Sequence, residues 1–187
     1  MDYFLTTARL GFRHWREDDL PLATSLWGDS EVSILLGGPF TPEQIHSRLT
    51  REIAQMQETG LQLWPIFLRE GGDFAGCAGL RPYQLSPSHP FRAERAKNGA
   101  PSNEPLVHEL GYHLVRASWG KGLATEAARA VIDHAFASLN ADALFAGHHP
   151  DNQASRHVLL KLGFEYTGEA IYPPLGWLEP TYLLRRP

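Results

Sequence analysis

The chain has 187 residues and a formal net charge of −4, with 43% hydrophobic and 20% charged residues. This length suits a single domain with its own core, and the composition is that of an ordinary globular protein. Without a long basic run, nucleic acid is not expected as the principal partner, and no apolar stretch approaches the roughly 18 residues of a membrane span.

The single cysteine and the N-terminal residues bear on location. Cys77 is the only cysteine, so a disulfide within the chain is excluded, and this fits a reducing compartment. The first residues lack a charged region followed by a long apolar run, so no signal peptide is expected. We therefore expect a cytoplasmic protein that binds no membrane.

The N-terminal region reads as a strand followed by helices. Periodicity predicts, in order, a strand at Arg9–Trp15, a helix at Glu17–Leu26 and a helical turn at Ser30–Gly38. The next helix has clear end signals: Thr41 suits the N-cap, Pro42 the first helical position, and Gln44 completes a capping box. Gly60 is expected to end it.

A predicted hairpin and an aperiodic segment follow. Strands are expected at Gln62–Arg69 and Phe74–Leu80. The segment Arg81–Leu106 is rich in Pro, Ser and Asn and shows no period, so it is expected to form a long loop insertion. A solvated insertion without a role is the favoured interpretation. The aromatic residues Tyr83 and Phe91 keep a lid over an acceptor site as the alternative.

The stretch His108–Phe136 organises the rest of the chain. It begins as a strand with alternating side chains, passes through a turn with Gly120 and Gly122, and becomes a helix from about Leu123. Such a turn lets the backbone approach a ligand closely, and the first N–H groups of the helix favour an anion. The stretch therefore suits a phosphorylated ligand, although a tight turn without a ligand is the alternative.

The C-terminal part is expected to complete an α/β domain. Strands are predicted at Ala143–Gly147, Phe164–Tyr166 and Tyr182–Leu184, and a helix between the cap Asn152 and the stop Gly163. His148, His149 and Asp151 do not have metal-ligand spacing, and adjacent histidines on an extended chain point to opposite sides. No metal is expected.

The residues Trp119-Gly-Lys-Gly-Leu-Ala-Thr-Glu-Ala127 resemble motif A of the GNAT N-acetyltransferases, most closely their RimJ/RimL-like branch. The general family pattern has Gln or Arg where Trp119 stands, and tryptophan is usual in this branch. The resemblance covers nearly the whole chain. It implies a single domain over residues 1–187, with a mixed, twisted α/β sheet of about seven strands, helices on both faces, and acetyl-CoA as co-substrate.

In that family the glycine loop holds the pyrophosphate of acetyl-CoA. The preceding strand splays from its neighbour and leaves backbone N–H groups near Leu114–Arg116 free for the pantetheine arm and the acetyl carbonyl. By this resemblance, the residues expected to bind the cofactor are Leu114, Val115, Arg116, Trp119, Gly120, Lys121, Gly122, Leu123, Ala124, Thr125 and Asn152.

Candidate proton-transfer groups lie in two places. Many GNAT enzymes carry a tyrosine acid where this chain has Leu159, but the RimJ/RimL-like branch has Asn-x-x-Ser, here Asn152 and Ser155, so Ser155 is the candidate proton donor. An ordinary helix cap is the alternative for this pair. Alternation puts Glu109 and His113 on one strand face, with Glu109 the first candidate for the base and His113 the second. A surface Glu and a satisfied core His are the alternative.

The expected function is acetyl transfer from acetyl-CoA to a primary amine, either a protein N-terminal α-amine or a small molecule. A non-catalytic acyl-CoA sensor and an enzyme with another acyl-CoA donor are the alternatives. Arg81, His157, Lys161 and Glu179 are interpreted as solvated side chains. The branch often dimerises, and the Pro173–Trp177 loop offers apolar residues, so a homodimer is one expected assembly.

Overall fold

The computed structural model describes residues 2–99, 104–172 and 175–187. They form one eight-stranded sheet in the order β1-β2-β3-β4-β5-β6-β8-β7, in which only β5 and β6 run parallel. The strands are β1 (Leu5–Thr6), β2 (Leu10–Phe12), β3 (Leu63–Leu68), β4 (Phe74–Tyr83), β5 (Val107–Leu114), β6 (Ala143–Gly147), β7 (Glu165–Ile171) and β8 (Leu178–Arg185).

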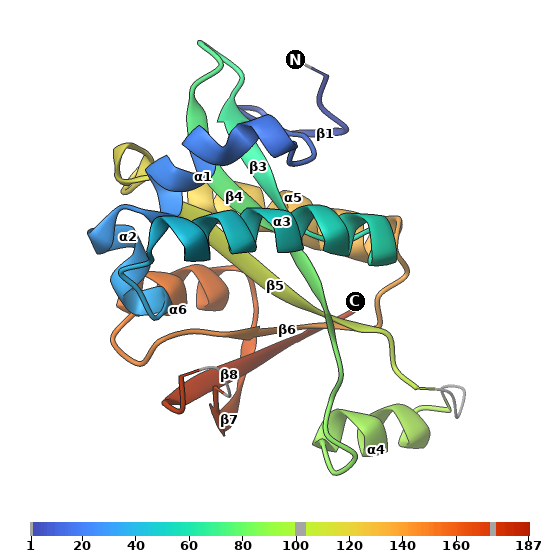
Figure 1. Cartoon of the computed structure of the whole chain (residues 1–187). Helices are drawn as coiled ribbons and strands as arrows, with labels where there is room; N and C mark the ends of the chain where they lie inside the picture. Colours follow the sequence, from blue (N-terminus) through green and yellow to red (C-terminus); the bar gives the residue numbers. More distant parts are fainter. Residues whose placement is uncertain (1, 100–103, 173–174) are drawn as a thin grey trace.

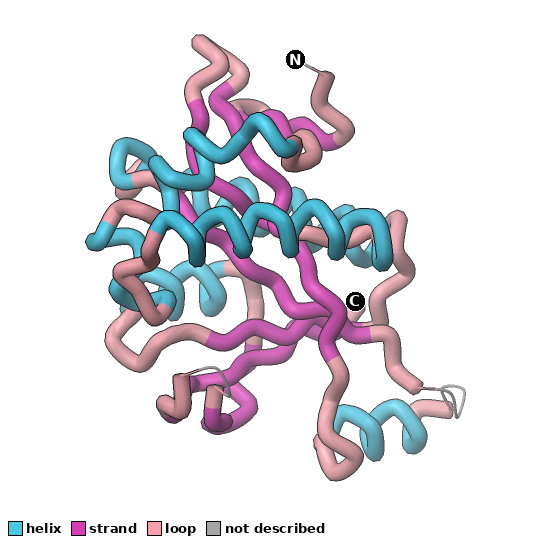
Figure 2. The backbone as a smooth tube through the Cα atoms, viewed as in Figure 1, coloured by secondary structure: helices cyan, strands magenta, loops and turns pink. Residues whose placement is uncertain are grey.

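Helices cover both faces of this sheet, as Figures 1 and 2 show. The α-helices are α1 (Leu20–Trp27), α2 (Ser30–Ser33), α3 (Pro42–Thr59), α4 (Pro90–Lys97), α5 (Leu123–Ala137) and α6 (Gln153–Lys161), and 3₁₀ turns are η1 (Glu17–Asp19), η2 (Ile34–Leu36) and η3 (Arg116–Ser118). The α/β fold with a mixed sheet and helices on both faces is confirmed. The sheet has one strand more than expected, because the two residues of β1 are too few to show alternation.

Two apolar clusters fix the helices to the sheet. The α5 stripe of Leu123, Ala127, Val131 and Ala135 is buried against one face, together with Leu159 of α6. On the other face α1 and α3 pack over β3 and β4. The predicted α3 signals are all present: Thr41 and Gln44 form the capping box, and Gly60 ends the helix at φ 74°.

The segment predicted as a loop insertion contains a helix. Its α4 begins after His89, whose ring nitrogen accepts a hydrogen bond from the Phe91 N–H at 3.2 Å. Phe91 and Leu85 are buried against Val107, Phe145 and Leu183. Burial of these apolar side chains stabilises a helix that Pro, Ser and Asn content had argued against. Residues 100–103 of this segment lie outside the described residues.

Candidate active site

The sheet opens between its two parallel strands. β5 and β6 pair only at Val107–Ala143, His108–Leu144 and Glu109–Phe145, although β5 continues to Leu114. The Val115 N–H donates to the Ala75 oxygen at 3.1 Å. Successive N–H groups of a strand point to alternate sides, so those of Tyr112 and Leu114 face the β6 side, where the described residues supply no strand partner. The predicted splay is therefore present.

The glycine loop after β5 leads into α5 with open backbone. Gly120 and Gly122 have φ of 71° and 73°, a left-handed conformation that favours glycine. A Cβ added at Gly120 would meet nothing within 4 Å, and one at Gly122 only an Arg9 nitrogen at 3.8 Å. Gly122 is the N-cap of α5, and no side chain caps this end. The first N–H groups of α5 therefore remain available to an anion.

A cavity of about 430 Å³ lies beside this loop. It brings together most of the predicted cofactor residues: its lining includes Leu114, Trp119, Gly120, Gly122, Leu123, Ala124, Thr125 and Asn152. The Trp119 indole N–H donates to the Leu114 oxygen at 2.8 Å, which ties the loop to the end of β5. This hydrogen bond gives the tryptophan a structural role at the position where the wider family has Gln or Arg.

Three predicted cofactor residues do not line this cavity. Val115 uses its N–H within the sheet, so the expectation of a free donor there is wrong. The Arg116 guanidinium pairs with Asp29 at 2.8 Å and Glu31 at 2.5 Å, and so anchors α2. The side chain of Lys121 is exposed, and only its carbonyl is engaged, by Arg9 at 2.9 Å.

Arg9 is a residue near the loop that the sequence interpretation did not single out. Its guanidinium pairs with Glu126 at 2.6 Å, in the first turn of α5. In the sequence, Glu126 stands out only as part of the motif Trp119–Ala127. The contact joins residues 117 positions apart, so only the folded chain shows it.

Ser155 and Asn152 lie at the start of α6, as predicted. The Asn152 side chain accepts a hydrogen bond from the Ser155 N–H at 3.0 Å, so it does cap the helix. The Ser155 hydroxyl is 2.8 Å from the Tyr112 hydroxyl. Burial raises the pKa of Tyr112 to about 12, although the Ser155 contact works in the opposite direction. No sequence signal pairs Tyr112 with Ser155, because the strand and the helix meet only in the fold.

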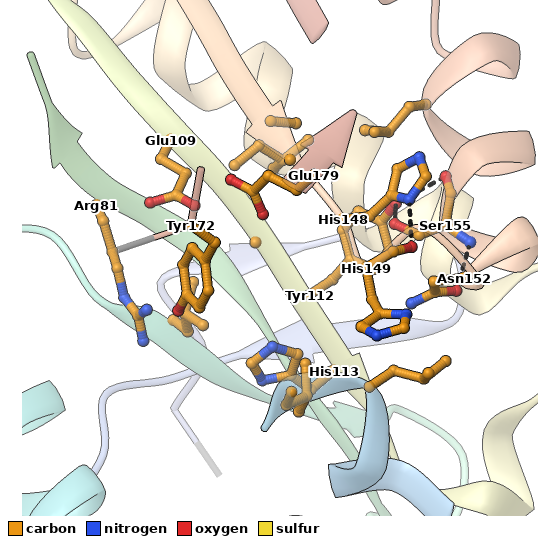
Figure 3. Close-up of a pocket in the computed structure, with 18 of the residues that line it drawn as sticks. Arg81, Glu109, Tyr112, His113, His148, His149, Asn152, Ser155, Tyr172 and Glu179 are labelled. Atoms are coloured by element: carbon orange, nitrogen blue, oxygen red, sulfur yellow. Dashed lines mark hydrogen bonds between the residues drawn. The ribbon is translucent and has the colours of Figure 1, made fainter. Parts of the chain in front are cut away.

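A second cavity, of about 120 Å³, lies on the other side of these hydroxyls. Its lining includes Glu109, His113, Arg81 and Glu179, and Figure 3 shows these side chains around it. The two cavities share Tyr112, His113, Asn152 and Ser155. A ligand in the larger cavity and one in the smaller would therefore meet beside Tyr112 and Ser155.

Glu109 and Glu179 face this second cavity from β5 and β8. The Glu179 carboxylate lies over Gly147, where an added Cβ would come within 2.7 Å of Oε1. Burial, followed by the Glu109 charge, raises the pKa of Glu179 to about 7. Burial also raises the pKa of Glu109, against the opposing charge of Arg81. The interpretation of Glu179 as a solvated side chain is not what the geometry shows.

His113 is positioned but poorly suited to accept a proton. Its Nδ1 accepts a hydrogen bond from the Trp27 indole N–H at 3.2 Å, and the Cys77 sulfur lies at 3.8 Å from the same atom. Burial, with the charges of Arg81 and Arg48, lowers its pKa to about 3. A neutral imidazole with one nitrogen already engaged is a weak base, so Glu109 is the stronger candidate.

Arg81 also belongs to the cavity wall. Its guanidinium forms a salt bridge with Glu52 of α3, whose side chain is only 2% exposed. The second Glu52 oxygen accepts the Leu63 N–H at 2.8 Å. Arg81 had been interpreted as solvated because a residue at the end of a strand has no partner in sequence. Its partner lies 29 positions away on a helix.

The other predicted features have the following places. No group of three or more His, Cys, Asp or Glu among the described residues could hold a metal ion. His148 lies 3.3 Å from the Tyr182 hydroxyl. Residues of α4 line neither cavity, so this helix does not form the lid considered above, and Arg81 is the one described residue of the Arg81–Leu106 segment that lines a cavity. The Pro173–Trp177 loop lies partly outside the described residues.

Relatives carry the same architecture. A family model described as an acetyltransferase (GNAT) domain matches residues 9–165. The uncharacterized N-acetyltransferase p20 of Bacillus licheniformis is 29% identical over 166 residues, which cover 88% of this chain and 83% of that protein. An acetyltransferase from Agrobacterium tumefaciens str. C58 has a TM-score of 0.76 and 25% identity, over 100% of this chain and 98% of that one.

The fold of the predicted branch also matches. RimL, a ribosomal L7/L12 alpha-N-protein acetyltransferase solved in complex with coenzyme A, has a TM-score of 0.73 at 16% identity, over 98% of each chain. At this identity the likeness concerns the fold. The family model extends over most of the chain and agrees with the glycine loop and the splayed sheet. This chain belongs to the GNAT acetyltransferase family and is an acyltransferase.

Proposed function

We propose that the protein transfers the acetyl group of acetyl-CoA to a primary amine by direct attack in a ternary complex. The observation that carries this proposal is the pair of cavities that meet at Tyr112 and Ser155. The larger would hold the thioester and the smaller the amine. The acceptor is a small-molecule amine or a protein N-terminal α-amine.

The glycine loop and the open edge of β5 would hold acetyl-CoA. The pyrophosphate fits the free N–H groups at the start of α5, between Gly120 and Thr125. The Leu114 N–H, on the splayed side of β5, is in place to stabilise the oxyanion as the amine adds to the acetyl carbonyl. Coenzyme A in the complex with RimL supports this choice of donor.

Glu109 is the proposed base, with Glu179 as its partner. A carboxylate there accepts a proton from the incoming ammonium, and the free amine then forms the N–C bond as the C–S bond breaks. The second proton that the nitrogen loses on becoming an amide balances the proton that the CoA thiolate takes up. An α-amine with a pKa near ~8 gives up this proton more readily than a lysine near ~10.4. Cys77 is buried and lines neither cavity, and burial raises its thiol pKa, which supports direct attack over a covalent intermediate.

Ser155, hydrogen-bonded to Tyr112, is the proposed donor of a proton to the CoA thiolate. The test is release of free CoA thiol across a panel of amines, with acetyl-CoA affinity measured in parallel. We expect Ser155→Ala to lower kcat by roughly 10²-fold with little change in acetyl-CoA affinity. Gln153→Ala, in the same helical turn but outside both cavities, is the matched control.

Each outcome of this experiment separates the alternatives. An unchanged kcat in Ser155→Ala would reject the proton-donor role. Tight acetyl-CoA binding with no turnover of any amine would favour a sensor. Faster turnover with succinyl-CoA than with acetyl-CoA would show that the enzyme uses another acyl donor.

A cytoplasmic location and a homodimer remain proposals. None of the described helices is both long and apolar enough to cross a membrane. Sedimentation of the purified chain would establish its assembly, and a monomer at micromolar concentration would reject the homodimer.

A further inference from the structure

The lining of the smaller cavity includes a cation that aromatic rings contact and that no salt bridge engages among the described residues. Arg48 of α3 lines this cavity. Among the described residues, none forms a salt bridge with Arg48. Its guanidinium lies 4.1 Å from the centre of the Phe40 ring and 5.8 Å from that of Trp27. These faces hold the guanidinium in place while its N–H donors stay available to a ligand.

The nearest acidic group is already engaged. Glu52 gives one oxygen to Arg81 and the other to the Leu63 N–H. Arg81 thus has a salt bridge, and Arg48 has none among the described residues. Burial and the repulsion of Arg81 and Arg51 lower the pKa of Arg48 against the smaller, opposing effects of Tyr172 and Glu52, so its environment on balance opposes the charged form. A partly buried cation without a partner costs stability, and a bound anion would offset that cost.

The same lining also carries the reverse charge. Glu109 and Glu179 border this cavity from β5 and β8. The cavity therefore offers carboxylates suited to an ammonium and, at Arg48, a cation suited to an anion. Its volume of about 120 Å³ is below the ~300–1,000 Å³ of sites for drug-sized ligands, so a compact molecule fits it best.

We propose that the acceptor is a compact zwitterion: a primary amine that also carries a carboxylate, which Arg48 binds while Glu109 and Glu179 receive the amine. This inference rests on the proposed acetyl transfer and narrows its acceptor. A guanidinium binds a carboxylate through paired hydrogen bonds, so the site would distinguish an amino acid from the corresponding amide.

The experiment compares each free amino acid with its own carboxamide, which keeps the amine and the side chain but removes the anion. The ratio of the two kcat/KM values is the readout, and acetyl-CoA is kept saturating. Loss of folded protein lowers both values together, so it leaves the ratio unchanged. We expect the acid to be preferred roughly 10- to 100-fold in the wild type, the range for a hydrogen bond to a charged group.

Variants of Arg48 then test whether this residue causes the preference for the acid. In Arg48→Met the ratio of the acid and amide kcat/KM values is expected to approach one, because the KM for the acid rises. Arg48→Lys keeps the positive charge and should retain part of the preference for the acid. Arg51→Met removes a cation from the same helix outside the cavity, and its ratio should equal that of the wild type.

Three results would overturn the inference. They are equal use of acid and amide by the wild type, a preference that persists in Arg48→Met, and a preference for peptides over free amino acids. In each case amines are still acetylated, so the proposed function survives. No turnover of any amine, with acetyl-CoA still bound, would overturn both.

Discussion

Glu109 and Glu179 reach the same cavity from strands that are not neighbours, since β6 lies between β5 and β8. Burial raises the pKa of both carboxyls, and the Glu109 charge contributes to the shift of Glu179 to about 7. Arg81 opposes the shift of Glu109, and Tyr83 lies near both carboxylates. Two interacting carboxyls titrate as a pair, so their apparent pKa values belong to the pair rather than to either residue.

This pairing predicts an acidic limb in the pH profile of kcat/KM. A protonated Glu109 cannot accept the proton of the ammonium, so activity should rise as the pH increases through the raised pKa of this carboxyl. Glu179→Gln removes a like charge beside Glu109, which lowers the pKa of Glu109 and moves the limb to lower pH. Initial rates over a pH series measure the shift.

Glu169→Gln on β7, an exposed residue outside both cavities, is the control and should leave the limb unchanged. A limb that stays in place in Glu179→Gln would show that the two carboxyls do not interact during catalysis.

Among the helices and strands, α4 is the one for which the structure differs most from the interpretation of the sequence. It packs through Phe91 onto Val107, Phe145 and Leu183, at the end of β4 and β5 away from α2 (Figure 1). It lines neither cavity. A helix fixed in this way supports the ends of interior strands and leaves the site open.

Phe91→Ala should therefore lower stability without changing catalysis. Removal of a buried aromatic ring costs about 3 kcal/mol, to be measured by denaturant unfolding. The kcat/KM at low temperature, where the variant is folded, should equal that of the wild type. Lys97→Ala, at the exposed end of α4, controls for changes in the helix surface. A specific loss of acceptor affinity in Phe91→Ala would restore the lid interpretation.

The elements also show what local sequence can and cannot predict. The α3 bounds follow from neighbours in sequence, since Thr41 and Gln44 cap each other. The glycine loop follows from backbone conformation at Gly120 and Gly122. The helix α4 could not be predicted from its neighbours in sequence, because it depends on burial against strands that are distant along the chain.

The candidate active site could likewise be predicted only where local sequence carries the signal. Sequence placed Glu109, Ser155 and Asn152 at the cavities, since each lies in or beside a recognisable motif. It missed Tyr112 as the partner of Ser155, 43 positions away, and Glu179, which reaches the cavity only because β8 pairs with β6. The use of the Val115 N–H was unpredictable for the same reason: its acceptor is Ala75, on another strand.

At the scale of the whole molecule, cofactor binding should stabilise the fold by mass action. At about 100 times its Kd, acetyl-CoA should add about 2.7 kcal/mol. For a domain of this size that raises Tm by about 5–10 °C, measured by thermal scans with and without acetyl-CoA. Gly122→Ala should shrink this shift, because a side chain at φ 73° is strained by about 1–2 kcal/mol and alters the loop.

Lys121 lies between the two glycines, so Lys121→Ala is the matched control for Gly122→Ala. Its side chain is exposed and lines neither cavity, so the full shift in Tm is expected. An equal loss in both variants would mean that the lysine charge, rather than the backbone, holds the pyrophosphate.

The short seam between β5 and β6 has a mechanical consequence. Among the described residues, three residue pairs join the β1–β5 plate to the β6–β8–β7 plate along the hydrogen-bonded direction. Apolar layers beneath α5 and α6 and beneath α4 also connect the plates. A ligand lodged in the wedge spans both plates and acts as a brace, so bound substrate should stiffen the open side of the sheet.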